Sequence, residues 1–360
     1  QLIEALQSGE YDLDNTSVMM TQTGGGCRAT NYIPLLRKAL IDAGFPQVPV
    51  VSLSMGNQGT EKGFKFTVPL LTRFMIAVLY GDLFERVVYR TRPYEAVEGS
   101  VNDLHAKWLE KARKNVESGS IFEFNRNMKK IVAEFDQIEL LDIQKPRVGV
   151  VGEILVKYSK TANNDIVSII EEEGGEAVVL DLIGFMNYSL YNQIWKADEI
   201  AFSKKNKLMA KTFIGIINML EKPMNKALKA SNRFDSIESI YDVASSTEEV
   251  ISIGNHTGEG WFLTGEMIEL LQKGVNNIIC LQPFGCLPNH IVGKGMMKEL
   301  RRQYPGANLA PIDYDPGVSA VNQLNRIRLM MTTAKKRMNK VSDSVEKSET
   351  ESKLETAQAY

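Results

Sequence analysis

Two cysteines, far apart in the sequence, stand in loops of similar design. Cys27 follows the glycines of TQTGGGCRATNY (21–32), and Cys286 lies in LQPFGCLPNH (281–290). Each comes after a predicted strand and just before a predicted helix. The amides and dipole of the following helix favour a thiolate or an anionic cluster, and the glycines let the backbone approach sulfur closely. The pattern favours both cysteines as ligands of an iron–sulfur cluster.

Other residues near these loops are predicted to contact the bound group. Gly25 and Gly26 give the backbone room beside Cys27, and Arg28 adds a positive charge. His290 follows Cys286 by four positions and could donate to cluster sulfur, although a hydrogen bond to the backbone is the alternative. His256, in NHTGEGW, comes after another predicted strand and is predicted to support a ligand.

The main alternative is a phosphate-binding loop. A glycine-rich loop between a strand and a helix more often binds phosphate than carries a working thiol. The Lys-Ser/Thr pair of a P-loop, a spaced G-x-G-x-x-G and a paired CxxC are all missing from the sequence. The third cysteine, Cys280, has Ile279 and Leu281 as neighbours in a predicted strand, so we predict that it is a core residue.

Strands and helices that alternate along the chain must position these loops. Such repetition specifies parallel sheets covered by helices on both faces, and ligands bind at the carboxyl ends of the strands. The sequence therefore predicts an α/β fold of two Rossmann- or flavodoxin-like lobes with parallel sheets and helical insertions. The predicted strands are residues 16–20, 48–53, 148–151, 177–180, 250–253, 277–281 and 309–312.

Composition shifts suggest where the domains divide. Pro146 separates a first lobe, 1–145, which ends in a helical extension, from a second lobe, 146–334. Residues from about 188 to 244 break the alternation and are predicted to form a helical insertion. Residues 335–360 are rich in Ser, Glu and Lys and are predicted to be disordered, because they cannot bury enough apolar surface.

The overall composition excludes several classes of protein. With 42 basic and 44 acidic residues the net charge is −2, which gives no reason to expect nucleic acid or a membrane surface as a partner. The longest apolar stretch, 74–80, is far too short to span a bilayer. Three cysteines are too few for a disulfide scaffold, so a reducing, cytoplasmic location is predicted.

Several runs of sequence together carry a family resemblance. With the two cysteine loops, VGEILVK (151–157), TANN (161–164) and NHTGEGW (255–261) resemble the C-terminal, 2-hydroxyacyl-CoA dehydratase-like portion of the long acyl-CoA dehydratase activase-related proteins. The resemblance extends from Gln1 to about Met331. It implies two flavodoxin-like lobes around a 4Fe–4S or larger cluster.

The resemblance also implies ligands and a function. Cys27 matches the family's glycine-preceded cysteine, and Cys286 matches that of its Pro-Phe-Gly-Cys phrase. The first lobe is expected to be incomplete, because the family has a further cysteine, in a Cys-Tyr-Pro phrase, upstream of Gln1. At least one cluster ligand is therefore expected outside this sequence.

The implied module accepts low-potential electrons from an ATP-dependent activase of the same polypeptide, for reductive or radical (de)hydration of a CoA thioester in anaerobic metabolism. One alternative is a non-catalytic electron-transfer or scaffold domain. Another is a module that has lost its cluster and binds CoA or a nucleotide. Pairing with a second subunit is left open.

Overall fold

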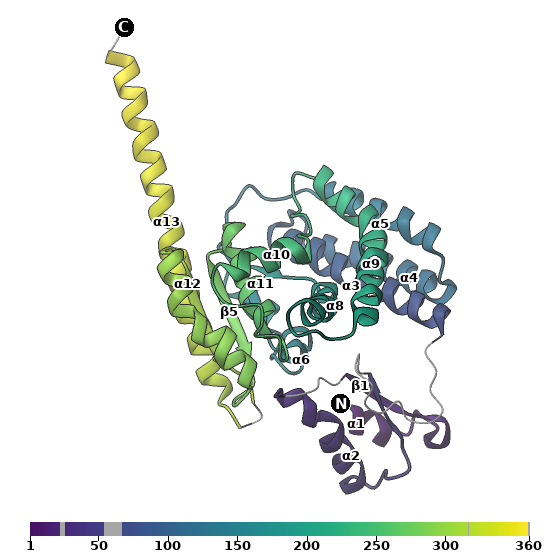
Figure 1. The fold of residues 1–360 in the computed structure, drawn as a ribbon. Helices are drawn as coiled ribbons and strands as arrows, with labels where there is room; N and C mark the ends of the chain where they lie inside the picture. The colour runs from purple at the N-terminus through teal and green to yellow at the C-terminus, as the bar shows by residue number, and fades with distance from the viewer. Residues whose placement is uncertain (22–25, 54–66, 316, 359–360) are drawn as a thin grey trace.

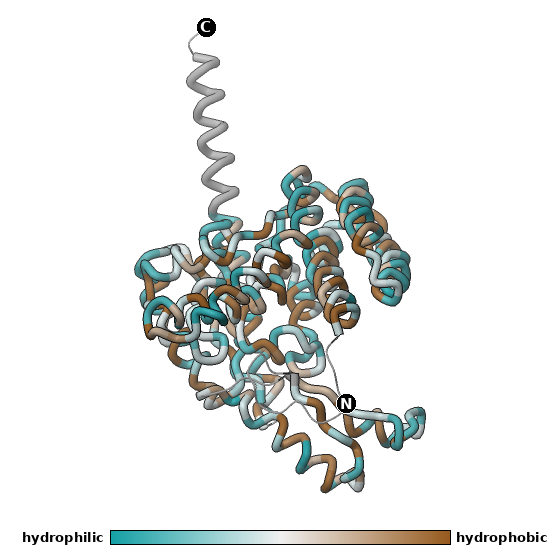
Figure 2. The backbone as a smooth tube through the Cα atoms, turned by 45° about the vertical axis from the view of Figure 1, so that its right-hand side comes forward, coloured by the Kyte–Doolittle hydropathy of each residue, from teal (hydrophilic) through white to brown (hydrophobic). Residues whose placement is uncertain are grey.

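The protein has an α/β fold with helical insertions, as predicted. In the computed structural model the chain is 63% helical and contains two sheets of parallel strands with interleaved helices (Figure 1). Hydrophobic residues gather inside the body, and hydrophilic residues follow its outer turns (Figure 2). The described residues are 1–21, 26–53, 67–315 and 317–358.

The first lobe is small and has its own sheet. Strands β1 (Val18–Thr21) and β2 (Val50–Leu53) pair in parallel, and α1 (Leu2–Gln7) and α2 (Tyr32–Asp42) pack beside them (Figure 1, purple). A short turn of helix, η1, covers Leu13–Asn15. The buried core of this lobe consists of Leu6, Val18, Ile33, Leu40, Val48 and Val50.

The second lobe contains a four-stranded parallel sheet. Its strands are β3 (Arg147–Gly152), β4 (Glu176–Val179), β5 (Asn277–Gln282) and β6 (Asn308–Asp313), in the order β4-β3-β5-β6. The first strand of the lobe is therefore central, with the second on one side and the third and fourth on the other. This is the order of a flavodoxin-like sheet.

Helices cover both faces of this sheet, because successive side chains of a strand point to opposite faces. On one face, α6 (Ile154–Tyr158), α7 (Ile166–Glu172) and α13 (Ala320–Gln358) share a core with alternate residues of the strands. On the other face lie α11 (Gly260–Gln272) and α12 (Met297–Gln303).

A helical body packs beside the second lobe around one apolar core. Helices predicted as an extension of the first lobe share this core with helices predicted as an insertion in the second. The first group is α3 (Val68–Thr91), α4 (Ser100–Ser118) and α5 (Ile121–Asp136); the second is α8 (Leu182–Glu199) and α9 (Lys204–Ala230). A 3-10 turn, η3 (Arg92–Tyr94), follows α3, and α10 (Ile240–Glu248) packs on α11.

The strand predicted for residues 250–253 is wrong. This segment forms turns after α10, where the backbone amides of Val250 and Ile251 both donate to Thr247 O at 2.9 Å. Its apolar side chains serve packing instead, since Ile253 is buried beside the aromatic residues of α8 and α11. A short apolar run does not distinguish a strand from a buried turn.

The C-terminal segment also differs from the sequence-based expectation. Disorder is predicted from residue 335, whereas α13 continues to Gln358. Near the start of this segment, Arg337 Nη1 donates to Gly306 O at 2.6 Å. Lys, Glu and Ala favour helix formation even where no core is buried. Within the described ranges, no helix combines the length and apolar content that a membrane span requires.

Candidate cofactor site between the two lobes

Cys27 of the first lobe and Cys286 of the second lie side by side where the lobes meet. Both side chains are buried, and the two thiols share a hydrogen bond. That hydrogen bond, followed by burial, raises the pKa of the Cys286 thiol above its usual value. The two loops singled out in the sequence therefore bring their sulfur atoms together.

A short turn of helix holds Cys27 in place. Cys27 precedes the 3-10 turn η2 (Arg28–Asn31), and Thr30 N donates to Cys27 O at 3.1 Å. On the other side of the cysteine, a Cβ atom at Gly26 would lie 3.6 Å from Leu287 Cδ2. The loop after β1 thus packs directly on the loop that carries Cys286.

Cys286 is held between β5 and an irregular helical turn. Cys286 N donates to Pro283 O at 3.2 Å, and Cys286 O accepts from His290 N at 3.1 Å. His290 Nδ1 also lies 2.9 Å from Cys286 O. The turn that follows is a π-helix, η4 (Asn289–Gly293), which continues into the 3-10 turn η5 (Lys294–Met296). Such π-turns occur frequently at functional sites.

The loop of residues 255–261 packs against the sulfur of Cys27. Gly258 has φ +61°, and a Cβ atom there would lie 3.1 Å from Cys27 Sγ and 2.8 Å from Pro288 Cγ. Tyr188 Oη donates to Gly258 O at 2.9 Å and fixes the loop on α8. Glycine is needed here for both its backbone conformation and its lack of a side chain.

Arg28 joins the two lobes. Its Nη1 donates to Phe284 O at 2.6 Å, and its Nη2 forms an ion pair with Asp315 Oδ1 at 2.9 Å. Phe284 N also donates to the Asp315 carboxylate. The positive charge of Arg28 is therefore neutralised by a carboxylate of the second lobe.

A buried amide links Cys286 to a carboxyl group. Asn289 Nδ2 lies 3.2 Å from Cys286 Sγ and 3.4 Å from Glu259 Oε2. Asn289 is fully buried, and its Oδ1 has no hydrogen-bond partner in the described part of the chain. The amide can donate to sulfur while its oxygen is left to accept from a further group.

Two glutamates near the cysteines hold protons more tightly than usual. Burial, with smaller contributions from the charges of Glu153 and Cys286, raises the pKa of Glu259 to about 8. Burial also raises the pKa of Glu153, whose Oε1 accepts from Tyr32 Oη of the first lobe at 3.2 Å. Glu259 therefore carries a proton at neutral pH.

The position of Glu153 depends on the close pairing of β3 and β5. Glu153 N donates to Leu281 O at 3.0 Å at the carboxyl end of both strands. The preceding residue, Gly152, has φ +142°, and a Cβ atom there would lie 2.0 Å from Leu281 O. Only glycine allows the two backbones to come this close.

The sequence runs VGEILVK and TANN have a supporting role in the structure. Lys157 Nζ and Glu266 Oε1 form an ion pair at 2.6 Å, with both side chains buried beside the sheet. Asn163 Nδ2 donates to the carbonyls of Val156 and Lys157, and its Oδ1 accepts from Ile166 N. These contacts close the connection between α6 and α7.

The residues predicted from sequence are brought together in part. Cys27, Cys286, Gly26, Arg28 and His290 all lie at the junction of the lobes, as described above. The ring of His256 instead packs against Trp195, tilted by 45° and at 5.3 Å between centroids, with its Nδ1 2.8 Å from Gly254 O. Gly25 lies outside the described residues.

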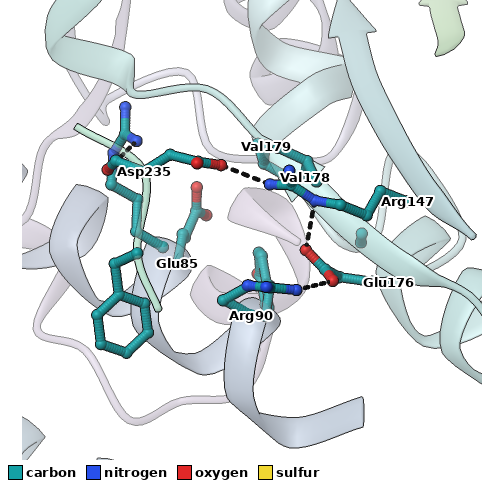
Figure 3. A pocket seen from close by; sticks show the side chains of 11 residues that line it. Glu85, Arg90, Arg147, Glu176, Val178, Val179 and Asp235 are labelled. Carbon is teal, nitrogen blue, oxygen red and sulfur yellow. Dashed lines mark hydrogen bonds and ion pairs between the residues drawn. The ribbon is translucent and has the colours of Figure 1, made fainter. Parts of the chain in front are cut away.

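A separate cavity lies at the opposite, amino ends of the strands (Figure 3). There Glu176 pairs with Arg90 and with Arg147, which also pairs with Asp235. The cavity has a volume of about 30 Å³, room for one or two waters. Ligands of open parallel sheets bind at the carboxyl ends, so we interpret this cluster as a structural clamp between α3 and the sheet.

The chemistry available at the junction is that of two adjacent thiols near Glu259, a buried carboxyl group that holds its proton at neutral pH. Two cysteine thiols match the thiolate ligation of iron–sulfur clusters. Among the described residues, no group of three or more His, Cys, Asp or Glu side chains is arranged to hold a metal ion. Comparisons with family models, curated proteins and solved structures give no match. The function must therefore be inferred from the site and its motifs.

Proposed function

We propose that this chain is an iron–sulfur module that accepts low-potential electrons from an ATP-dependent activase, with Cys27 and Cys286 as two of the cluster ligands. The observation that carries the proposal is the contact between the two thiols, one from each lobe, beside the carboxyl end of β5. The resemblance of the motif runs to the dehydratase-like proteins supports it.

The number of ligands requires a contribution from elsewhere. A 4Fe–4S cluster takes about four ligands, usually cysteines. Two are supplied by Cys27 and Cys286, and the resemblance implies another in a Cys-Tyr-Pro phrase upstream of Gln1. Asn289 would donate to the Cys286 sulfur, and hydrogen bonds to ligand sulfurs tune the reduction potential of a cluster.

The reaction that we propose is reductive or radical (de)hydration of a CoA thioester. When bound, the cluster supplies the electron for this chemistry. Glu259 holds a proton near the thiols, and burial raises the pKa of Glu153, which together limit the negative charge that accumulates there. Tyr32 of the first lobe donates its hydroxyl hydrogen bond to Glu153 of the second.

A second candidate function is electron transfer without catalysis. The burial of both cysteines favours it, since their exposed fractions are 6% and 0%. An electron can reach a buried cluster, whereas a thioester needs an open path to it. Turnover of CoA thioesters after chemical reduction separates the two functions, because only the catalytic module consumes the substrate.

Iron and sulfide content after anaerobic reconstitution tests the cluster itself. We expect the present chain to fold without iron, because its core comes from β/α packing. A longer chain that includes the upstream cysteine should bind a cluster, which Cys27→Ala and Cys286→Ala each abolish. Cys280→Ala is the matched control and should keep its iron, since Cys280 is buried inside β5.

Two results would reject the iron–sulfur function. The longer protein could stay colourless after reconstitution, or both alanine variants could retain full iron. Circular dichroism of each variant must show a native fold, so that loss of iron is not mistaken for unfolding.

A further inference from the structure

The contact between Cys27 and Cys286 also permits a reaction that needs no metal. The two thiols share a hydrogen bond, and a Cβ atom at Gly258 would meet both the Cys27 sulfur and Pro288, which lies two residues after Cys286. A disulfide requires the two Cβ atoms to lie about 3.5–4.5 Å apart. The third cysteine is placed differently. Cys280 Sγ lies inside the core, 3.2 Å from where a Cβ atom of Gly293 would stand. The geometry therefore singles out one pair.

We propose that Cys27 and Cys286 of the iron-free protein form a reversible disulfide that joins the two lobes, with a low-molecular-weight disulfide such as glutathione disulfide as the oxidant. The proposal does not depend on the iron–sulfur function, because it requires only the two thiols. It gives the site a second, oxidised state in which neither sulfur can act as a ligand.

The reaction proceeds by two thiol–disulfide exchanges. Cys27, as its thiolate, attacks one sulfur of glutathione disulfide; the S–S bond breaks, and one glutathione leaves as a thiolate that takes up the proton lost by Cys27. Cys286 then attacks the sulfur of Cys27 in the mixed disulfide, and the second glutathione leaves with the proton of Cys286. The protein thiols are oxidised by two electrons, and glutathione disulfide is reduced to two thiols.

The order of attack follows from exposure. Cys27 keeps an exposed fraction of 6%, whereas Cys286 has 0%, so an external disulfide meets Cys27 first. Cys286 is then already beside Cys27 and can resolve the mixed disulfide.

The proposed disulfide would cross the boundary between the two lobes. The apolar core of the first lobe contains residues of that lobe alone. Polar contacts cross the boundary, including Arg28 with Asp315 and Tyr32 with Glu153. Domains joined by polar interfaces of this kind generally move relative to one another. A covalent bond at the same place would hold them together while the protein lacks iron.

Thiol counting in glutathione buffers tests the proposal. Iron-free protein is equilibrated at increasing ratios of oxidised to reduced glutathione, quenched with acid, alkylated and analysed by intact mass and peptide mapping. The number of reduced cysteines should fall from three to one, which is Cys280, and the peptides that contain Cys27 and Cys286 should be joined within one chain. Dithiothreitol should restore all three.

Three variants provide the controls. Cys280→Ala should oxidise as the wild type does and end with no free thiol. Cys27→Ser should stay monomeric and keep Cys286 reduced. Without Cys27 to react first, the buried Cys286 thiol is shielded from the oxidant. Cys286→Ser should stop at a mixed disulfide of Cys27 with glutathione, because the resolving thiol is gone.

Clear outcomes would overturn the proposal. They are a folded wild-type protein that keeps three free thiols in fully oxidising buffer, a disulfide that includes Cys280, or links between molecules in place of the intramolecular one. These results are independent of iron content, which is measured in the reduced protein. Failure of the disulfide and failure of the cluster are thus distinguishable.

Discussion

Arg28 and Asp315 form an ion pair at 2.9 Å that connects the loop of the first cysteine to the segment after the last strand of the sheet. The same guanidinium donates to Phe284 O, two residues before the second cysteine. Arginine suits this place because its planar group can reach a carboxylate and a carbonyl at once. Arg28 therefore fixes Cys27 in front of Cys286.

Replacement of Arg28 should loosen the cysteine pair without unfolding either lobe. In Arg28→Met we expect Cys27 and Cys286 to react several-fold faster with a thiol reagent, because the lobes separate more often. Lys38→Met is the matched control, since it removes an exposed ion pair with Asp42 inside the first lobe. Equal labelling rates in the two variants would contradict the role given to Arg28.

Gly258 should tolerate no side chain. Alanine there would adopt a left-handed conformation and meet both Cys27 Sγ and Pro288 Cγ. We expect Gly258→Ala to lower the free energy of unfolding by about 1–3 kcal/mol and to reduce the yield of the Cys27–Cys286 disulfide. Gly274→Ala has similar backbone strain, at φ +77°, but no neighbour within 4 Å. It should cost stability and leave the disulfide yield unchanged.

Glu259 should make the stability of the iron-free protein depend on pH. Its pKa is about 8 in the folded protein, against 4.5 for an unperturbed glutamate. Between these values the folded state holds a proton that the unfolded state has lost, so stability falls as pH rises through this range. The loss is on the order of a few kcal/mol. Glu259→Gln should remove that part of the decline in urea unfolding between about pH 5 and pH 9.

A second buried glutamate tests whether this effect is local. Burial also raises the pKa of Glu221, on α9, to about 8. Glu221→Gln should remove a separate part of the decline, and the two substitutions together should be additive, as expected for distant sites. An unchanged pH profile in Glu259→Gln would show that its carboxyl group titrates normally.

The ion pair of Lys157 and Glu266 should be needed as a pair. Lys157→Met leaves a buried carboxyl group without its partner and should lower the free energy of unfolding by about 3–5 kcal/mol. Lys157→Met combined with Glu266→Met should recover much of that loss, because no buried charge remains. Urea unfolding of the single and double variants measures the difference. A double variant less stable than the single one would contradict this account.

Much of the fold was predictable because its strands are short apolar runs followed by polar or glycine residues. Strand β5 is predicted at 277–281 and observed at Asn277–Gln282. The predicted strand at 250–253 has the same apolar character, yet its amides complete the end of α10. Sequence pattern reports burial, and tertiary contacts decide whether a buried segment pairs with a sheet.

The site was predictable only in part. The proximity of Cys27 and Cys286 was predictable because ligands bind at the carboxyl ends of parallel strands, although the two strands belong to separate sheets. Glu153, Glu259 and Asn289 were missed, although they stand in the motif runs. Their unusual properties come from burial and from neighbours distant in sequence, which no local pattern reports. Their places beside predicted strand ends and Cys286 were the available signal.

The separation of Cys27 and Cys286 along the chain has a consequence for protein synthesis. At ~5–20 residues per second, a ribosome needs on the order of 10–50 s to pass from one cysteine to the other. During that time Cys286 has not yet been made, and Asp315, the ion-pair partner of Arg28, is made later still. The first lobe alone cannot hold a cluster between the two lobes. Under the proposed function, iron delivery would therefore follow translation, and Cys27 would have to stay reduced until the rest of the chain is made.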